Sequence, residues 1–516
     1  MNILKIKGLR ALKSAATGLL ASVALSGVVH ATEPAVDKDT IVFATDRNIA
    51  ILDAQVDNTG NSDRYHWQLF DNLYTFDQDG RLTPQIAESF ERSDDGLTYT
   101  FKIRDDVVFH NGAALTAEDV KYSIERILDP EVQSTRRPYF ATTIDSVEVT
   151  DPSTVVVNMA KPDAVFMNKA AAFIAIVPKE YTESLDSPDE FARNPVGAGP
   201  YKFVELNVGQ SLTLERFDDY YGEKPGIKTL VFKFISDSST RVNALLTGEV
   251  DMADKIDAAD VKRLETTDGI DVLPVPTGSP LHVRLYANDP DSPISDPKVR
   301  LALNYAVDEN AIIESVMHGV GEPLSSFISK YYPVGVDPEL EPYGYDPEKA
   351  RQLLAEAGYP NGFDTKLLCP TSYSKDVAQA VVAFWSAVGI NAELQIMDYS
   401  AWARLNNTHK SGPMTIMQYS NAINDPITPI FGTASKAGTW SDYENDEVEA
   451  LIEKTNAASD PEERDKLFRE IGKILRETGH SVLISEMFYV FGKNAGIEWE
   501  PQRGYAFYNL RTVSWK

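Results

Sequence analysis

The sequence is poor in the residue types from which many enzymes and metal proteins build their sites. It contains a single cysteine, Cys369, so no intramolecular disulfide can form. Its seven histidines are scattered along 516 residues, and no H-E-x-x-H, paired-cysteine or G-x-S-x-G motif is present. We therefore expect no catalytic residue, no metal site and no cofactor, and the sequence indicates a protein that is not an enzyme.

Positive charge is also scarce. The 49 Lys and Arg residues are outnumbered by 77 Asp and Glu residues, which gives a formal net charge of −28. Such a field repels phosphate backbones and anionic membrane surfaces, so it argues against nucleic acid as a partner. An acidic surface also keeps an exported protein soluble, and the charge alone therefore does not identify a function.

Long apolar runs are confined to the first 31 residues. Residues 15–29 form an apolar segment of signal-peptide length, and Val29-His30-Ala31 fits a cleavage site. No later run approaches the roughly 18 to 20 residues that would span a bilayer. No cysteine lies at the cleavage site to receive a lipid. We therefore expect residues 1–31 to be a cleavable signal peptide and the protein to be periplasmic. The positive charges before the apolar segment are Lys5, Lys7, Arg10 and Lys13.

The most regular pattern lies in residues 87–128. Tyr99, Phe101 and Ile103 alternate with polar residues, the period of a half-buried strand. Asn111-Gly112 predicts a turn that ends the strand region. Beyond it, Thr116 with Asp119 three residues on predicts the start of a helix with a capping box. These local sequence patterns predict a hairpin followed by an amphipathic helix.

Further along, strands and helices alternate. Strands at 365–368 and 392–397, each followed by a helix, predict parallel pairing in a sheet covered by helices. A strand at 280–288 should place His282, Arg284 and Tyr286 on the face opposite Val283. The segment 197–200 is rich in glycine, but Lys202 and a following strand argue against a phosphate loop.

Five stretches together resemble one protein family. The run G-L-T-Y-T-F-K-I-R-D-D-V-V-F-H-N-G at 96–112 is similar to the signature of the family 5 extracellular solute-binding proteins, the dipeptide and oligopeptide receptors of bacterial ABC importers. His110 belongs to this signature, and we interpret it as structural. Four more stretches follow in the order and spacing of the family: N-P-V-G-A-G-P-Y-K-F at 194–203, A-L-L-T-G-E-V-D-M at 244–252, D-P-K-V-R-L-A-L-N-Y-A-V-D at 296–308 and Y-D-P-E-K-A-R-Q-L-L-A-E-A-G-Y at 345–359.

The resemblance implies an α/β, two-lobed periplasmic-binding-protein fold of type II with a hinge. It implies a receptor that captures a small solute between the lobes and delivers it to an inner-membrane ABC permease whose ATPase subunits are cytoplasmic. We expect a monomer. By resemblance, lobe I comprises residues 33–82, 195–288 and 490–516, an inserted subdomain comprises 83–194, and lobe II comprises 289–489.

The resemblance also implies site residues. A peptide needs a carboxylate for its ammonium and a cation for its carboxylate, since a charge left unpaired in a closed cleft costs about 3 to 5 kcal/mol. Asp425 is similar to the aspartate that holds the amino terminus in peptide-binding relatives, although Asp425-Pro426 is also an ordinary turn sequence. Dipeptide-binding relatives carry an Arg after the strand at 365–368, which this chain lacks, and their D-P-D is D-P-I here. Arg284, or Arg404 beside Trp402, is the substitute cation, unless Arg284 pairs with a carboxylate of the protein.

The remaining site candidates are polar and aromatic residues of the expected cleft. They are Asn58 and Tyr65 in the polar loop at 53–65 and its following helix, His282, Tyr373, Trp402, Tyr419, Ser420, Asn421 and Trp440. Any one aromatic residue is more often part of a core than of a cleft wall. A short peptide is the leading ligand, and an oligosaccharide, an opine-like conjugate or a nickel complex stay open. A secreted hydrolase and a periplasmic chaperone are more distant alternatives.

Overall fold

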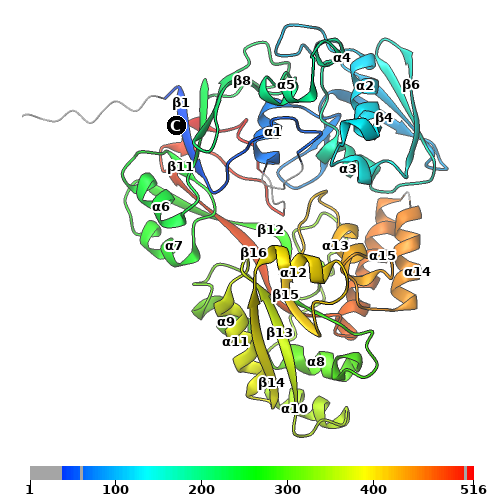
Figure 1. Cartoon of the computed structure of the whole chain (residues 1–516), viewed down its shortest axis with the longest axis vertical. Coiled ribbons are helices and arrows are strands. Elements are labelled where there is room, and N and C mark those ends of the chain that lie inside the picture. The colour runs from blue at the N-terminus through cyan, green and yellow to red at the C-terminus, as the bar shows by residue number, and fades with distance from the viewer. Residues whose placement is uncertain (1–37, 58–61, 459, 505–507) are drawn as a thin grey trace, which may run out of the picture. The chain divides into compact units, whose positions relative to one another are not determined.

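The computed structural model describes residues 38–57, 62–458, 460–504 and 508–516 (Figure 1). The expected signal peptide and Asn58 lie outside these residues. Within the described ranges, no helix combines the length and the apolar character needed to cross a membrane.

A ten-stranded sheet runs through most of the described chain. Its strands are β1 Thr40–Thr45, β8 Tyr201–Asn207, β9 Ser211–Arg216, β10 Thr229–Phe234, β11 Met252–Ala253, β12 Ile270–Leu285, β13 Phe363–Pro370, β14 Ile390–Met397, β15 Met414–Gln418 and β16 Ser481–Asn494. They lie in the order β14-β13-β15-β12-β16-β11-β1-β10-β9-β8. Strands that are distant in the sequence are therefore neighbours, such as β1 with β11 and β12 with β16.

One end of this sheet is built around β1. It pairs in parallel with β10 and β11, while β10, β9 and β8 form an antiparallel meander. The alternating apolar residues of these strands are buried, among them Phe43 and Phe232, whose rings meet edge to face at 5.8 Å. Helix α1 Asp63–Leu69 packs on this core through Tyr65, and α6 Ser238–Leu246 links β10 to β11.

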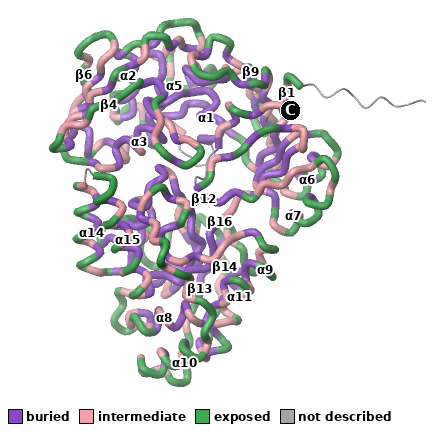
Figure 2. Tube along the Cα trace, turned by 180° about the vertical axis from the view of Figure 1, so that it is seen from behind, coloured by how far each residue is buried: buried purple, intermediate pink, exposed green. Residues whose placement is uncertain are grey.

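The two longest strands, β12 and β16, pair antiparallel along most of their length. Residues 275–285 of β12 are buried, as are residues 481–486 and 490–493 of β16; Figure 2 colours buried residues purple. The register shifts between Pro276 and Pro280, and Gly278 there has φ +67°. A Cβ at Gly278 would lie 2.5 Å from the carbonyl oxygen of Gly504, so only glycine fits at this register shift.

The other end of the sheet confirms the parallel pairing predicted from the alternation of strands and helices. β13 and β14 pair in parallel through eight residues each, and β15 lies parallel to β13. The helices here are α8 Pro297–Tyr305, α9 Glu309–Ser315, α10 Pro347–Glu356, α11 Lys375–Ser386 and α12 Tyr399–Asn406. Trp385 of α11 is fully buried and donates a 3.0 Å hydrogen bond to the Leu303 carbonyl, which ties α11 to α8.

A separate four-stranded sheet contains the predicted hairpin. Its strands are β4 Ala87–Arg92, β5 Thr98–Ile103, β6 Ile144–Asp151 and β7 Thr154–Met159, in the order β4-β5-β7-β6. Tyr99, Phe101 and Ile103 of β5 are buried, as predicted. Helix α2 Ala117–Leu128 begins with the predicted capping box, in which the Asp119 carboxylate accepts from the Thr116 amide at 2.9 Å.

The remaining elements include three helices that the sequence analysis did not predict, α7, α13 and α14. The residues after Pro426 form α13, and most of them are buried. A proline followed by an apolar run is compatible with the start of a buried helix and also with a loop, so the sequence alone did not distinguish the two. The division into two lobes and an inserted subdomain stays a prediction. The elements not yet given are β2 Tyr74–Phe76, β3 Leu82–Pro84, α3 Phe166–Phe173, α4 Lys179–Glu183, α5 Pro188–Arg193, α7 Ala258–Glu265, α13 Ile427–Ala434, α14 Asp446–Ala457, α15 Pro461–Glu477, β17 Ile497–Glu498 and β18 Ser514–Trp515.

Candidate ligand-binding site

The loop after β15 carries four of the predicted site residues. β15 is buried along Met414–Met417, and the chain leaves the sheet at Tyr419. Ser420 is exposed, whereas Asn421 is buried and donates to the Gly504 carbonyl at 2.6 Å. Asn424 donates to the Gly80 carbonyl at 2.7 Å. The loop is therefore held by segments that are far away in the sequence.

Asp425 is engaged by a cation of the protein. Its two carboxylate oxygens accept from Arg464 of α15 at 2.5 and 2.9 Å, and Oδ1 also accepts from the Ile427 amide at 2.9 Å. Both partners of this pair are buried. A solute ammonium that used Asp425 would have to share a carboxylate whose charge Arg464 already balances.

Arg284 of β12 is engaged in the same way. It donates to Asn406 Oδ1 at 2.6 Å and forms an ion pair with Asp442, and Asp442 also contacts His409 Nδ1 at 2.9 Å. Burial lowers the pKa of Arg284, although Asp442 opposes the shift. The structure thus shows the pairing with a protein carboxylate, which was the alternative to a ligand role. Arg404 lies exposed on α12.

Three predicted aromatic residues come together. The ring of Trp440 lies 5.9 Å from that of Trp402 and 5.2 Å from that of Tyr419. Trp402 is fully buried and its Nε1 donates to Thr415 Oγ1 at 2.8 Å, whereas Tyr419 and Trp440 are half-buried. Tyr373 is attached to the same region through a 3.5 Å bond from its hydroxyl to the Gln418 carbonyl. Tyr419 and Trp440 are therefore the partly accessible members of an aromatic cluster.

The other predicted residues are buried. His282 of β12 packs edge to face on Phe327 at 4.9 Å, and burial lowers its pKa to about 3. Tyr65 is fully buried, its hydroxyl donates to the Arg47 carbonyl at 2.5 Å, and its ring meets that of Phe232 at 4.9 Å. Both side chains support the fold around the site.

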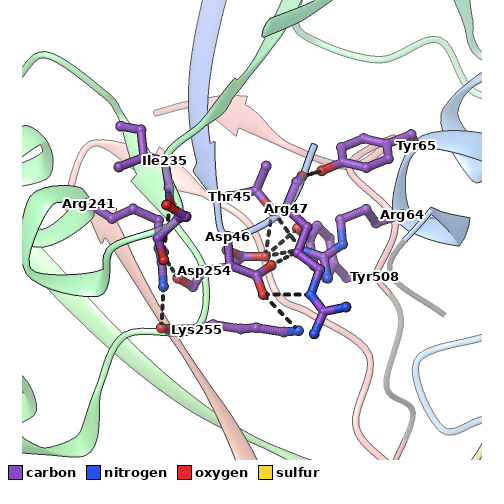
Figure 3. Close-up of polar contacts among 11 residues, drawn as sticks. Thr45, Asp46, Arg47, Arg64, Tyr65, Ile235, Arg241, Asp254, Lys255 and Tyr508 are labelled. Atoms are coloured by element: carbon purple, nitrogen blue, oxygen red, sulfur yellow. Dashed lines mark hydrogen bonds and ion pairs between the residues drawn. The ribbon is translucent and has the colours of Figure 1, made fainter. Parts of the chain in front are cut away.

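The sequence reading missed a charged cluster beside Tyr65 (Figure 3). Asp46 and Arg47 follow β1, Asp254 and Lys255 follow β11, and Arg64 comes from α1. Arg64 forms an ion pair with Asp254 and contacts Asp46 at 3.1 Å, and the Tyr508 hydroxyl donates to Asp254 at 2.9 Å. Burial opposes the ionisation of Asp46, but Lys255 and Arg64 nevertheless lower its pKa. The signal that could have found the cluster is polar residues directly after two parallel strands.

Comparisons with known proteins agree on one family. The model for "Bacterial extracellular solute-binding proteins, family 5 Middle" matches residues 81–441. Heme-binding protein A of Haemophilus influenzae is 32% identical over 441 residues, covering 78% of this chain and 79% of the relative. The glutathione-binding protein GsiB of Pectobacterium atrosepticum is 30% identical over 450 residues, covering 84% and 85%. The solved structure of HbpA2 from Haemophilus parasuis has a TM-score of 0.84 at 26% identity, over 92% of this chain and 100% of that one.

These matches and the fold confirm both the predicted family and the predicted α/β periplasmic-binding-protein architecture. The chain therefore belongs to the family 5 bacterial extracellular solute-binding proteins and is a substrate-binding receptor.

Proposed function

We propose that this protein is the periplasmic receptor of an ABC importer and that its solute is a short peptide of about the size of glutathione. The observation that carries the proposal is the 30% identity with a glutathione-binding protein across 84% of the chain. The export signal predicted for residues 1–31 agrees with a periplasmic location. The family consists of solute-binding receptors. In this proposal the chain delivers its solute and ATP hydrolysis belongs to the importer's cytoplasmic subunits.

The aromatic cluster supports a solute of this kind. Pockets for small molecules combine aromatic walls with a few oriented polar groups. Tyr419 and Trp440 are partly accessible, and Ser420 and Asn421 follow Tyr419 directly. We assign these four residues to the wall that contacts the peptide. Asp425 is proposed as a weaker anchor for the amino group, because Arg464 balances its charge.

The experiment that tests the proposal is native mass spectrometry of the mature protein purified without denaturation, followed by isothermal titration calorimetry. The titrants are glutathione, dialanine and trialanine. We expect a bound species that fragments into amino acids and at least one peptide that binds with a micromolar or lower Kd. A protein that binds none of the three peptides, and releases a solute without amino acids, would contradict the proposal.

Trp440→Ala and Thr439→Ala make a matched pair for the same titration. Trp440 touches both other rings of the aromatic cluster, whereas its neighbour Thr439 is exposed. Loss of an aromatic wall residue should weaken peptide binding roughly tenfold or more. The Thr439 variant should bind as the unmodified protein does.

Heme is a second candidate solute, because the relative with 32% identity is named a heme-binding protein. Titration with hemin, followed by its Soret absorption, tests this directly. A saturable spectral change with one hemin per chain, in a protein that ignores all three peptides, would replace the peptide by heme as the solute.

A further inference from the structure

Two parallel strands end side by side and bring four charged residues together. Phe43 and Ala44 of β1 pair with Met252 and Ala253 of β11, so the residues that follow each strand leave the same edge of the sheet. Asp46 and Arg47 follow β1, and Asp254 and Lys255 follow β11. Figure 3 shows these side chains gathered at that edge. In open α/β sheets, the carboxyl ends of parallel strands are where ligands bind.

The cluster contains more positive than negative charge. Arg47, Arg64 and Lys255 lie 3.6, 3.1 and 3.3 Å from the Asp46 carboxylate. Asp254 is the second carboxylate, so three cations share two anions within the described part of the chain. A local excess of cations is unusual in a chain whose formal net charge is −28. It favours an anionic group at this position.

Of the three cations, two are accessible. The Arg64 side chain is only 3% exposed, whereas that of Arg47 is 63% and that of Lys255 is 21% exposed. The Lys255 Nζ also lies 5.0 Å from the centre of the Tyr489 ring on β16. Arg64 therefore fixes the two carboxylates, and Arg47 and Lys255 are the cations that a solute can reach.

The backbone at Lys255 is held in a rare conformation. Its φ is +46°, a region that non-glycine residues seldom adopt. The buried Arg241 guanidinium fixes this turn by donating to the carbonyls of Asp254 at 3.1 Å and Lys255 at 2.7 Å, and to those of Ile235 and Ser236. Strain of this kind persists where the surroundings fix it, and it concentrates at functional sites. Arg241 thus pre-orients the main chain that carries Lys255.

We propose that Arg47 and Lys255 bind a carboxylate of the solute, with Asp46 orienting both cations. This inference rests on the proposed peptide-receptor function and names the group that recognises the acidic end of the peptide. It replaces Arg284, whose guanidinium is already occupied by Asp442 and Asn406. Two charge-assisted contacts to one carboxylate would make the receptor select free acids over amides.

The test compares free acids with amides on unmodified protein and variants. Dialanine and trialanine, each as the free acid and as the C-terminal amide, are titrated by calorimetry into unmodified protein, Arg47→Met and Lys255→Met. We expect unmodified protein to prefer the acids, and each variant to lose about 10- to 100-fold of affinity for the acids while binding the amides as before. Lys255→Arg should restore the preference for acids, since it keeps the charge.

Arg81→Met and Lys233→Met are matched controls, because they remove an exposed cation between β2 and β3 and a half-buried cation on β10. Both variants should prefer the free acids over the amides as strongly as the unmodified protein does. Unmodified protein that binds acid and amide equally, or variants that keep the preference, would overturn this inference and leave the peptide receptor intact. Unmodified protein that binds none of the four probes would overturn the peptide proposal and this inference with it.

Discussion

His110 connects two motifs that are 87 residues apart. The Gly197 amide donates to its Nδ1 at 3.2 Å, and its Nε2 meets the Gly199 carbonyl at 3.0 Å. With one ring nitrogen accepting and the other donating, the ring is a neutral imidazole. Burial lowers the pKa of His110 to about 4, in agreement with that form. Two family stretches, H-N-G and G-A-G-P, are thus joined through one side chain.

We predict that His110→Asn lowers the free energy of unfolding by about 1 to 3 kcal/mol, because at least one of the two backbone groups is left without a partner. Urea denaturation at pH 7 measures the change. The exposed His318 provides the control, and His318→Asn should unfold almost as the unmodified protein does. Equal midpoints for all three proteins would contradict a structural role for His110.

Asp442 is the buried partner of Arg284, and its removal should be costly. Asp442→Asn leaves the Arg284 guanidinium buried without a carboxylate, and we expect a loss of about 3 to 5 kcal/mol in the free energy of unfolding. Chemical denaturation measures it. Asp446→Asn removes a fully exposed carboxylate from a surface pair with Lys436 and should change little. A small effect of Asp442→Asn would reopen a ligand role for Arg284.

At the scale of single elements, α2 shows how local sequence controls structure. Thr116 and Asp119 satisfy each other's backbone amides, and the helix then buries Val120, Ile124 and Ile127 against the four-stranded sheet. The three residues lie on one stripe because they are three or four positions apart. Capping and stripe both depend on neighbours within one turn, so the sequence was sufficient to predict them.

Thr116→Ala should therefore cost about 1 kcal/mol of the free energy of unfolding, the usual effect of losing an N-cap hydroxyl. Differential scanning calorimetry on the purified variant measures it as a lower Tm. Thr266 follows α7 and is exposed, and Thr266→Ala should leave the Tm nearly unchanged. If the two substitutions lower the Tm equally, the capping box is not responsible.

Glu486 of β16 is a buried carboxyl group beside β12, and it should make the free energy of unfolding depend on pH. Glu486 accepts from the Ser279 amide at 2.9 Å, and its Oε2 has no hydrogen-bond partner within the described part of the chain. Burial raises the pKa of Glu486 to about 7, although Ser329 and the Ser279 amide oppose the shift, and Glu322 adds to it. A raised folded-state pKa means that the protonated form stabilises the fold.

The stability contributed by Glu486 is therefore fully present below its unfolded pKa, about 4.5, and is lost as the pH rises through 7. We predict that Glu486→Gln becomes more stable relative to unmodified protein between pH 5 and pH 8, by up to about 3 kcal/mol. Urea midpoints across that range measure the difference. The exposed Glu500→Gln should show no such trend, and a constant difference between Glu486→Gln and the unmodified protein would refute the prediction.

On the scale of the whole molecule, the dominant electrostatic feature is the net charge of −28. Like charges repel within a compact structure, and salt screens this repulsion over about 10 Å at 0.1 M. We predict that raising NaCl from about 20 to about 300 mM increases the free energy of unfolding by about 1 kcal/mol. Urea is the suitable denaturant because it is uncharged. A decrease with salt would show that attractive ion pairs outweigh the repulsion.

The sequence by itself determined the family, the fold class and most of the helices and strands. These depend on periodicity and on signals within a few residues, such as the alternation in β5 and the capping box of α2. It missed α7, α13 and α14. In α13 an apolar run follows Pro426, and such a run is compatible with loop or helix until its burial is known.

Only the tertiary structure decided which charges are available to a solute. Asp425 and Arg464 are 39 residues apart, Arg284 and Asp442 are 158 apart, and Arg64 and Asp254 are 190 apart. A carboxylate and a cation neutralise each other only when the fold brings them within a few ångströms, and no local pattern records that meeting. The sequence therefore indicated candidate charges, and the pairing of distant strands and helices decided which of them the protein uses internally and which it leaves accessible.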